Sequence, residues 1–481
     1  MTKWFNRSRR PSPISPEDYI PLHQKVAYGV GGAVDWFTTG IMAALWMPVF
    51  NLGYGIKPGL LGLVLMIYRI WDAFTDPIMG NISDNTRTRW GRRRPYIVAG
   101  AILAACITPF MWRMNPAWTQ TTMLIYITVV GILLYGATTM WAMPYNSMML
   151  EMTPSYDERT RVAAARTIFT KLGLLIGSWV LPFCASSYFA DPVTGEPNIL
   201  AGAQFVSIPL SIAVVVLGVM PALFIKERYY AKEASKQARE PLIRGLKDSM
   251  SIRPLWMMIG FVVFQLFGAG ITGALGAYIN FFYISGGELA DASIIEGLKG
   301  TTAFFVGLIA IPFWTWLCEK LDKKWTMMII IGSGFIGAFL NLLCLTPKYP
   351  YLQIVPAVFY ASVTASIWLI VPSMMADLVD FDERKTGKRR EGSINSVFSW
   401  FMKLGSTLPV GLAGFVLQWT GFDQAAGKLQ PPEVLQRMLV WYICLPLIFW
   451  SISLVLIYFY PLNRKRLQEV RRELEERRGK I

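Results

Sequence analysis

The chain has 481 residues, of which 54% are hydrophobic and 16% are charged, whereas soluble domains carry about 25% charged residues. This composition excludes an ordinary soluble domain and indicates a protein that crosses a membrane many times. The net charge of +15 does not indicate a nucleic-acid partner, because the basic residues lie in short segments between apolar runs, as the positive-inside pattern requires. With one histidine, His23, and no CxxC pair, we expect no catalytic centre, no cofactor and no resident metal.

Twelve apolar runs are long enough to be transmembrane helices, since about 20 residues cross a hydrocarbon core of about 30 Å. We expect an all-α membrane protein with helices at about 25–51, 58–83, 95–114, 122–150, 163–189, 203–225, 254–284, 296–318, 325–346, 352–376, 393–419 and 437–461. The even number places both termini on one side. The tails 1–24 and 462–481 are basic, which predicts cytoplasmic termini in a cell inner membrane.

The first transmembrane helices contain ionisable residues at membrane depth. Arg69, Asp72, Asp76 and Gly80 are spaced 3, 4 and 4 residues apart, so on a helix they form one polar seam. Such residues usually line an ion or substrate path, and two acids against one base leave a negative charge that a proton or cation would balance. The alternative is a static ion-pair network that only holds helices together.

The segment after this seam reads GNISDNTRTRWGRRR, from Gly80 to Arg94. Gly80 would permit close helix approach, Asp84 can cap or pair at the helix end, and the arginines anchor the cytoplasmic face. We expect these residues to gate and orient the protein. The alternative is that they serve only as a topology signal.

The longest polar interruption, 226–253, divides the chain into two bundles of six helices, 25–225 and 254–461. An internal repeat supports this division, because the sequences DER and KLG recur in the same order after the fourth and tenth helices. They occupy 157–159 and 171–173 in the first half, and 382–384 and 403–405 in the second. Parallel six-helix repeats indicate the major facilitator fold, with a central cavity between the halves.

The segments RIWDAFTDPIMGNISDNTRTRWGRRRP, YGVGGAVDWF, PYNSMMLEMTPSYDERTR and MADLVDFDERKTGKRREGSINSVFSWFMKLG extend over both halves. They resemble the glycoside-pentoside-hexuronide:cation symporter family. The resemblance implies cation binding by Asp72, Asp76, Thr75 and Thr139. It also implies a sugar site at Asp35 and Arg166, with Lys403 near the cation. Ala142 and Asn146 depart from the sugar-contacting residues of the family's melibiose carriers, so the substrate that Asn146 would contact need not be melibiose.

Lys171, in the fifth predicted helix, is additional to the residues of those carriers. An extra positive charge near the cavity would favour an anionic sugar, such as a uronate or a sulfonated sugar. The alternative is a lysine whose side chain extends to the cytoplasmic surface, with a gating or structural role only.

We expect the coupling ion to be Na⁺, with H⁺ or Li⁺ as alternatives. Asp72 and Asp76 lie one helical turn apart, and Pro77 frees the Ala73 carbonyl beside them. The hydroxyls of Thr75 and Thr139 add neutral donors that Na⁺ favours and a proton does not require.

The sequence thus predicts a monomeric carrier that couples a cation to transport of a sugar or glycoside. A carrier of another solute, including a lysolipid, and a non-transporting membrane sensor are the alternatives. The last predicted segment, NRKRLQEVRRELEERRGKI, is either an interfacial helix on anionic lipid or a solvated charged tail.

Overall fold

A computed structural model of the chain describes residues 19–153, 156–192, 195–225, 250–387, 391–423, 426 and 430–478. Within these residues the regular structure is helical, apart from one isolated bridge between Ala190 and Pro197. Twelve helical runs there are long and apolar enough to cross a membrane. The prediction of an all-α protein with twelve transmembrane helices is therefore confirmed.

The first half of the chain supplies six of these runs, and the first run combines four short helices. Its elements are α1 (Leu22–Asp35), η1 (Trp36–Gly40), α2 (Ile41–Met47), η2 (Pro48–Gly53), α3 (Pro58–Asn85), α4 (Arg94–Met111), α5 (Gln120–Met152), α6 (Tyr156–Ser178), α7 (Val180–Cys184), η3 (Ser187–Phe189) and α8 (Ile199–Phe224). The helix α3 continues through Pro77.

The second half repeats this arrangement and adds a helix at its end. Its elements are α10 (Arg253–Tyr278), η5 (Ile279–Ile284), α11 (Leu289–Lys320), α12 (Lys323–Cys344), η6 (Pro350–Gln353), α13 (Ile354–Thr386), α14 (Glu391–Thr420), α15 (Pro432–Tyr458) and α16 (Arg464–Arg478). Most of the segment 226–253, predicted to link the halves, lies outside the described residues.

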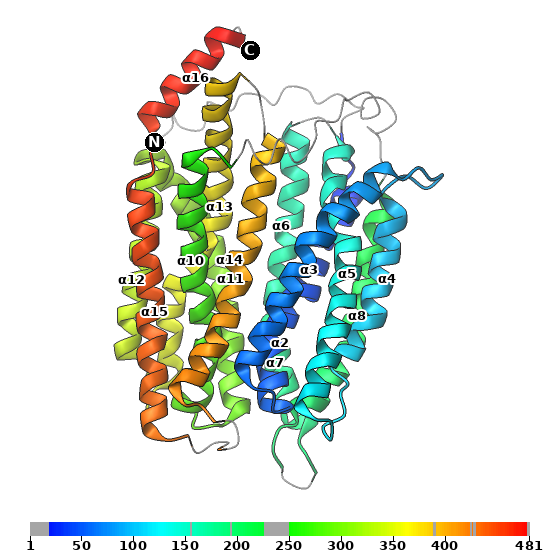
Figure 1. The fold of residues 1–481 in the computed structure, drawn as a ribbon, viewed down its shortest axis with the longest axis vertical. Helices are drawn as coiled ribbons and strands as arrows, with labels where there is room; N and C mark the ends of the chain where they lie inside the picture. Colours follow the sequence, from blue (N-terminus) through cyan, green and yellow to red (C-terminus); the bar gives the residue numbers. More distant parts are fainter. Residues whose placement is uncertain are drawn as a thin grey trace.

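Figure 1 shows the two halves side by side, with both ends of the chain at the same end of the helices. We call this end the termini side and the opposite end the loop side. The first run, from α1 to η2, and the run from α10 to η5 both begin on the termini side, and each ends on the loop side in a π-helix. These two π-helices each hold a fully buried asparagine, Asn51 in η2 and Asn280 in η5, so the repeat extends to this local irregularity.

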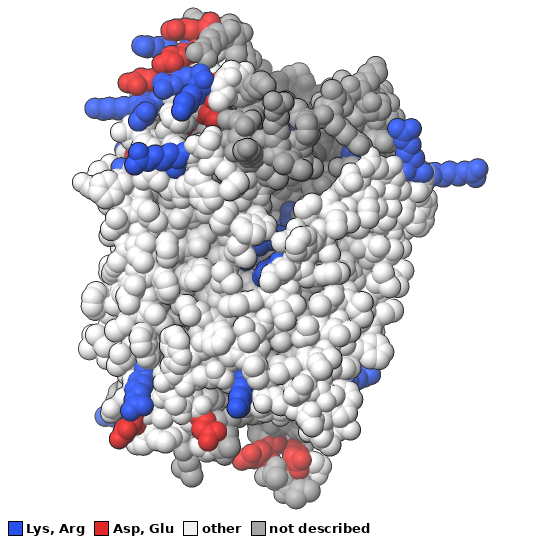
Figure 2. All heavy atoms as spheres, in the orientation of Figure 1, with Lys and Arg blue, Asp and Glu red and all other residues white. Residues whose placement is uncertain are grey.

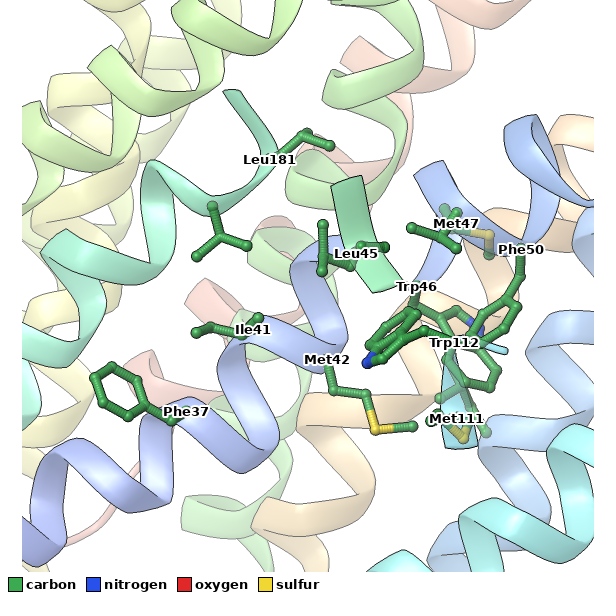
Figure 3. Packing of buried hydrophobic residues seen from close by; sticks show 14 of the residues in the cluster. Phe37, Ile41, Met42, Leu45, Trp46, Met47, Phe50, Met111, Trp112 and Leu181 are labelled. Atoms are coloured by element: carbon green, nitrogen blue, oxygen red, sulfur yellow. The ribbon is translucent and has the colours of Figure 1, made fainter. Parts of the chain in front are cut away.

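The apolar core joins the two halves on the loop side. One continuous cluster contains residues from η2 and α5 as well as Phe281 and Phe422 of the second half, whereas a separate cluster belongs to the second half alone. In Figure 3, Trp46 and Phe50 pack beside Trp112, and the rings of Phe50 and Trp112 stack with centroids 5.3 Å apart. Aromatic side chains of this size supply much of the burial that stabilises a core.

Two glycines allow the halves to approach closely on the loop side. A Cβ added at Gly62 of α3 would lie 2.7 Å from the carbonyl oxygen of Gly411 in α14, so α3 has no room for a side chain there. A Cβ added at Gly411 would lie 3.2 Å from the carbonyl oxygen of Gly62, which is a tight contact. At Gly80 the same test finds nothing within 4 Å. The close approach expected at Gly80 is therefore not made in this structure, and Gly62 makes it instead.

On the termini side the first half is held together by Glu158, which is fully buried. Its carboxylate accepts from Lys25 at 2.7 Å, from Arg161 at 2.7 Å and from the amide of Ile20 at 3.1 Å. Burial alone would raise the pKa of Glu158, but these hydrogen bonds outweigh it, so its pKa lies below the ordinary glutamate value. Glu158, which belongs to α6, thus connects this helix to Ile20 before α1 and to Lys25 within α1.

The helix α16 packs on the second half. Val470 and Leu474 are buried, Arg466 lies over the ring of Phe381 at 5.5 Å, and Glu473 pairs with Arg384 of α13 at 3.3 Å. Both interpretations of this tail, an interfacial helix and a solvated tail, require its apolar residues to face lipid or water. They face α13 instead, because α13 extends beyond the predicted membrane segment as far as Thr386.

Candidate functional site

The polar seam from Arg69 to Gly80 lies within α3, away from both ends of the helix. Asp72 is 6% exposed and accepts a hydrogen bond from Arg69, one turn earlier, at 2.9 Å. The Arg69 guanidinium also lies 6.0 Å from the centre of the Tyr135 ring of α5. Arg69 therefore neutralises Asp72 within the first half.

Asp76 has a partner in each half. One carboxylate oxygen accepts from the hydroxyl of Thr139 in α5 at 3.2 Å, and the other pairs with the ammonium of Lys403 in α14. With two acids and one base, the residues of α3 alone predict one uncompensated negative charge. That expectation is not met in this structure, because α14 supplies the second base, and Arg69 and Lys403 together balance Asp72 and Asp76.

A second polar contact joins the halves at the same level. The Arg69 guanidinium donates to the hydroxyl of Thr407, which lies one turn after Lys403 on α14. Arg69 and Asp76 are two turns apart on α3, and Lys403 and Thr407 are one turn apart on α14, so both contacts belong to one helix–helix seam.

The predicted sugar pair forms a second polar group. Arg166 of α6 approaches Asp35 at the end of α1, with 3.7 Å between the nearest nitrogen and oxygen atoms. The guanidinium lies 5.2 Å from the centre of the Tyr145 ring, which stacks between Tyr28 and Trp141 with centroids 4.6 Å from each. The loose ion pair above an ordered aromatic stack leaves donors and acceptors for a ligand.

Three predicted residues lie apart from these groups. The Thr75 hydroxyl donates to the carbonyl of Trp71 in its own helix at 3.1 Å, and its hydrogen-bond partner is therefore not Asp76. Asn146 is exposed and makes no hydrogen bond to another described residue. Asp84 belongs to α3, but its side chain lies outside the described part of the chain.

Lys171 lies on α6 and faces the second half. Its ammonium nitrogen is 3.1 Å from the position that a Cβ would occupy at Gly307 of α11. The interpretation that its side chain extends to the termini-side surface does not describe this structure, because Gly307 lies well inside α11.

The sequence reasoning missed Tyr135, Tyr145 and Thr407. Tyr145 follows Trp141 by one turn on α5, which is a signal for one aromatic face, but no sequence pattern says that an arginine from α6 covers it. Thr407 follows Lys403 by one turn and could have been found as a polar seam on α14.

Figure 2 shows charged side chains at the two ends of the molecule and an uncharged middle band. The exception is a hollow between the halves, in which basic side chains are visible. Among the described residues no group of three or more His, Cys, Asp or Glu side chains could hold a metal ion. The carboxylates and hydroxyls of the central polar groups are hard oxygen ligands, a type that suits hydroxyls or a small cation.

A family model described as MFS/sugar transport protein matches residues 27–464. The chain belongs to this family. Members of the MFS/sugar transport family similar to this chain include an isoprimeverose transporter from Lactiplantibacillus pentosus, which is 24% identical over 95% of this chain and 92% of its own. A glucuronide carrier protein homolog from Escherichia coli is 25% identical over 94% of this chain and 95% of its own. The expected glycoside-pentoside-hexuronide family membership is thereby confirmed.

The fold of this family member is also that of solved transporters. A crystal structure of a D-xylose-proton symporter matches 92% of this chain and 96% of its own with a TM-score of 0.61 and 14% identity. The MFS/sugar transport protein described here is thus a membrane transporter with the major facilitator fold.

Proposed function

We propose that the protein carries a sugar or glycoside together with Na⁺ across a bacterial-type inner membrane. The observation that carries this proposal is the pairing of two polar groups at mid-membrane, Asp35 with Arg166 and Asp76 with Lys403. The first offers a carboxylate and a guanidinium to vicinal hydroxyls, and the second offers carboxylates to a cation. The names of the isoprimeverose and glucuronide relatives support a glycoside substrate.

In the proposed mechanism, Na⁺ takes the place of the Lys403 ammonium at Asp76. The Thr139 hydroxyl, 3.2 Å from Asp76, adds a neutral oxygen ligand. Asp72 becomes a further ligand of the ion once its hydrogen bond with Arg69 is broken. Thr75 becomes one once its hydroxyl no longer donates to the carbonyl of Trp71. H⁺ or Li⁺ is the alternative ion for the same carboxylates.

Displacement of Lys403 couples the ion to movement of the halves, because Asp76 and Lys403 belong to different halves. When the ion replaces Lys403 at Asp76, the halves lose one ion pair that stabilises the present state. Sugar bound at Asp35 and Arg166 then favours the opposite state through its own differential contacts.

Uptake of radiolabelled sugars into proteoliposomes under imposed Na⁺ or H⁺ gradients tests the proposal. We expect concentrative uptake of at least one sugar with a Na⁺ gradient, and none in the Asp72→Asn and Asp76→Asn variants. Sugar exchange without a gradient should persist in both variants. Accumulation that persists in the double variant would exclude this coupling site, and failure of every sugar would exclude sugar transport.

We also propose that the termini side is cytoplasmic. Because the contacts between the halves lie on the loop side, as in the hydrogen bond from Tyr278 to Asn51, the present state is then inward-facing. With the five native cysteines replaced, Arg89→Cys should react with an impermeant maleimide only from the cytoplasm, and Ala117→Cys only from outside. The opposite labelling would reverse the orientation.

A further inference from the structure

Lys171 has no carboxylate partner among the residues that the structure describes, unlike the other bases of the central site. Three ion pairs account for three acids and three bases, namely Asp35 with Arg166, Asp72 with Arg69, and Asp76 with Lys403. Among the described residues no acid lies within ion-pair distance of Lys171, so four bases face three acids and one positive charge is left over. An ammonium at this depth is costly unless water or an anion compensates it.

The position of Lys171 on α6 is too deep for its ammonium to reach the termini side. It follows Tyr156, where α6 begins, by 15 residues, which is about 22 Å of helix. This distance is several times the length of a lysine side chain, and the ammonium lies beside Gly307 of the other half. Because Gly307 carries no side chain, the ammonium can approach the backbone of α11 closely.

The faces of α6 place Lys171 towards the second half and away from lipid. Ile168, Leu172 and Ile176, one turn apart from each other, are 60%, 40% and 56% exposed and mark the lipid face. Thr167 and Lys171 are one turn apart and so share another face of α6. Thr167 on this face is polar and exposed. On the second-half side, α6 packs against α11, where Lys171 approaches Gly307 and Ser178 approaches Gly300.

We propose that Lys171 is a specificity residue that binds an anionic oxygen group of the transported glycoside. This inference rests on the proposed sugar transport and adds the charge of the substrate to it. Lys171 follows Arg166 by five residues, about 7.5 Å along the helix axis and about 140° around it, so Arg166 faces α1 and Lys171 faces α11. A glycoside between α1 and α11 can contact both side chains. Hydroxyls at one end of the sugar then bind Asp35 and Arg166, while a carboxylate, sulfonate or phosphate at the other end binds Lys171.

A matched set of ligands tests this directly on the full-length protein in nanodiscs. The set is methyl glucoside, methyl glucuronide, the corresponding 6-sulfonate and the 6-phosphate, each measured by calorimetry. We expect at least one anionic member to bind about tenfold tighter than methyl glucoside, as a charge-assisted hydrogen bond allows. The member that binds most tightly distinguishes carboxylate, sulfonate and phosphate.

The Lys171→Gln variant should bind that anionic member only as tightly as methyl glucoside, whereas Lys171→Arg should keep most of the preference. Lys171→Met, which is close in length, serves as a second neutral variant should Lys171→Gln not fold. As a control for the loss of one charge, Lys57→Gln alters an exposed lysine at the loop side and should keep the full preference.

Two results would overturn the inference without touching the proposed transport of sugar. The first is wild-type protein that binds and carries methyl glucoside as well as, or better than, every anionic member. The second is a Lys171→Gln variant that weakens charged and neutral ligands by the same factor. If no member of this set and no sugar of the uptake panel is bound or carried, the proposed sugar transport fails with it.

Discussion

The loop side and the termini side of the molecule are held together in different ways. On the loop side the contacts cross between the halves, as in the hydrogen bond from Tyr278 to Asn51 at 2.6 Å and the bond from Trp179 to Thr301 at 3.0 Å. On the termini side the ion pairs described above stay within one half, as Glu158 does with Lys25 and Arg384 with Glu473.

This difference identifies the state of the transporter. Every cross-half contact described above lies between the loop side and the middle of the membrane, and the deepest is that of Asp76 with Lys403. The loop side is therefore closed by contacts between the halves, whereas the termini-side ion pairs described above, such as Glu158 with Lys25, join residues of one half. In alternating access the cross-half contacts must break and the within-half contacts must persist.

The largest expected effect follows from a side chain at the Gly62–Gly411 contact. In Gly62→Val the added Cβ would lie 2.7 Å from backbone that cannot rotate away, so the loop side cannot close. We expect transport to be lost and loop-side cysteines to become permanently reactive with an impermeant maleimide. The control is Gly332→Val in α12, where nothing lies within 4 Å, and it should transport normally. Full transport by Gly62→Val would show that this contact is not needed.

The Glu158 cluster should have the next largest effect, on stability and not on the transport state. In Glu158→Gln the donors of Lys25 and Arg161 lose a charged acceptor, which should lower the free energy of unfolding by about 1–3 kcal/mol at neutral pH. Thermal unfolding of the purified protein measures this loss.

The pH dependence of the same site has a definite sign. Because the pKa of Glu158 is lowered on folding, its stabilisation is present above the ordinary glutamate pKa, about 4.3, and is lost as the pH falls through the folded value. The melting temperature of the wild type should therefore fall more steeply than that of Glu158→Gln below about pH 4.3. Equal slopes would show that the Glu158 carboxylate does not stabilise the fold.

A smaller effect is expected for Tyr278→Phe, which removes one cross-half hydrogen bond. The loss of about 1 kcal/mol should shift the equilibrium several-fold towards the state that is open on the loop side. Maleimide labelling rates of a loop-side cysteine measure the shift. Tyr460→Phe is the control, because its hydroxyl contacts Met258 within the second half, and it should leave the rates unchanged. An unchanged rate in Tyr278→Phe would mean that the bond does not hold the closed state.

The smallest effect is expected for Arg384→Gln. The pair with Glu473 is partly exposed and should contribute less than about 1 kcal/mol. We expect normal transport and only faster hydrogen exchange in α16. Loss of transport would instead indicate that α16 takes part in the alternation of the halves.

The sequence could predict the twelve helices because each one needs a long apolar run, and length alone identifies such runs. It could also predict the acids and bases of α3, since charges within an apolar run stand out. The π-helices η2 and η5 could not be predicted, because Asn51 and Asn280 are paired by tertiary contacts such as those from Tyr278 and Gln353.

The candidate site was predictable residue by residue but not contact by contact. Helical spacing places Arg69 beside Asp72, and the structure has that pair. The spacing of residues within α3 could not show that Lys403, more than 300 positions later, forms an ion pair with Asp76. It also could not show that the Thr75 hydroxyl donates to the carbonyl of Trp71. The sequence also could not show which glycine of α3 contacts α14, because both Gly62 and Gly80 lie within the same predicted helix. The structure shows that it is Gly62.

The exchange of Na⁺ for Lys403 at Asp76 is tested most directly by sugar binding with and without Na⁺ at constant pH and ionic strength. The measurement is calorimetry on wild type and Asp76→Asn, using whichever sugar the uptake panel identifies. We predict that Na⁺ tightens sugar binding to wild type by about 5- to 150-fold and has no effect on Asp76→Asn. Equal sugar affinity in wild type with and without Na⁺ would contradict the proposed coupling of Na⁺ to sugar.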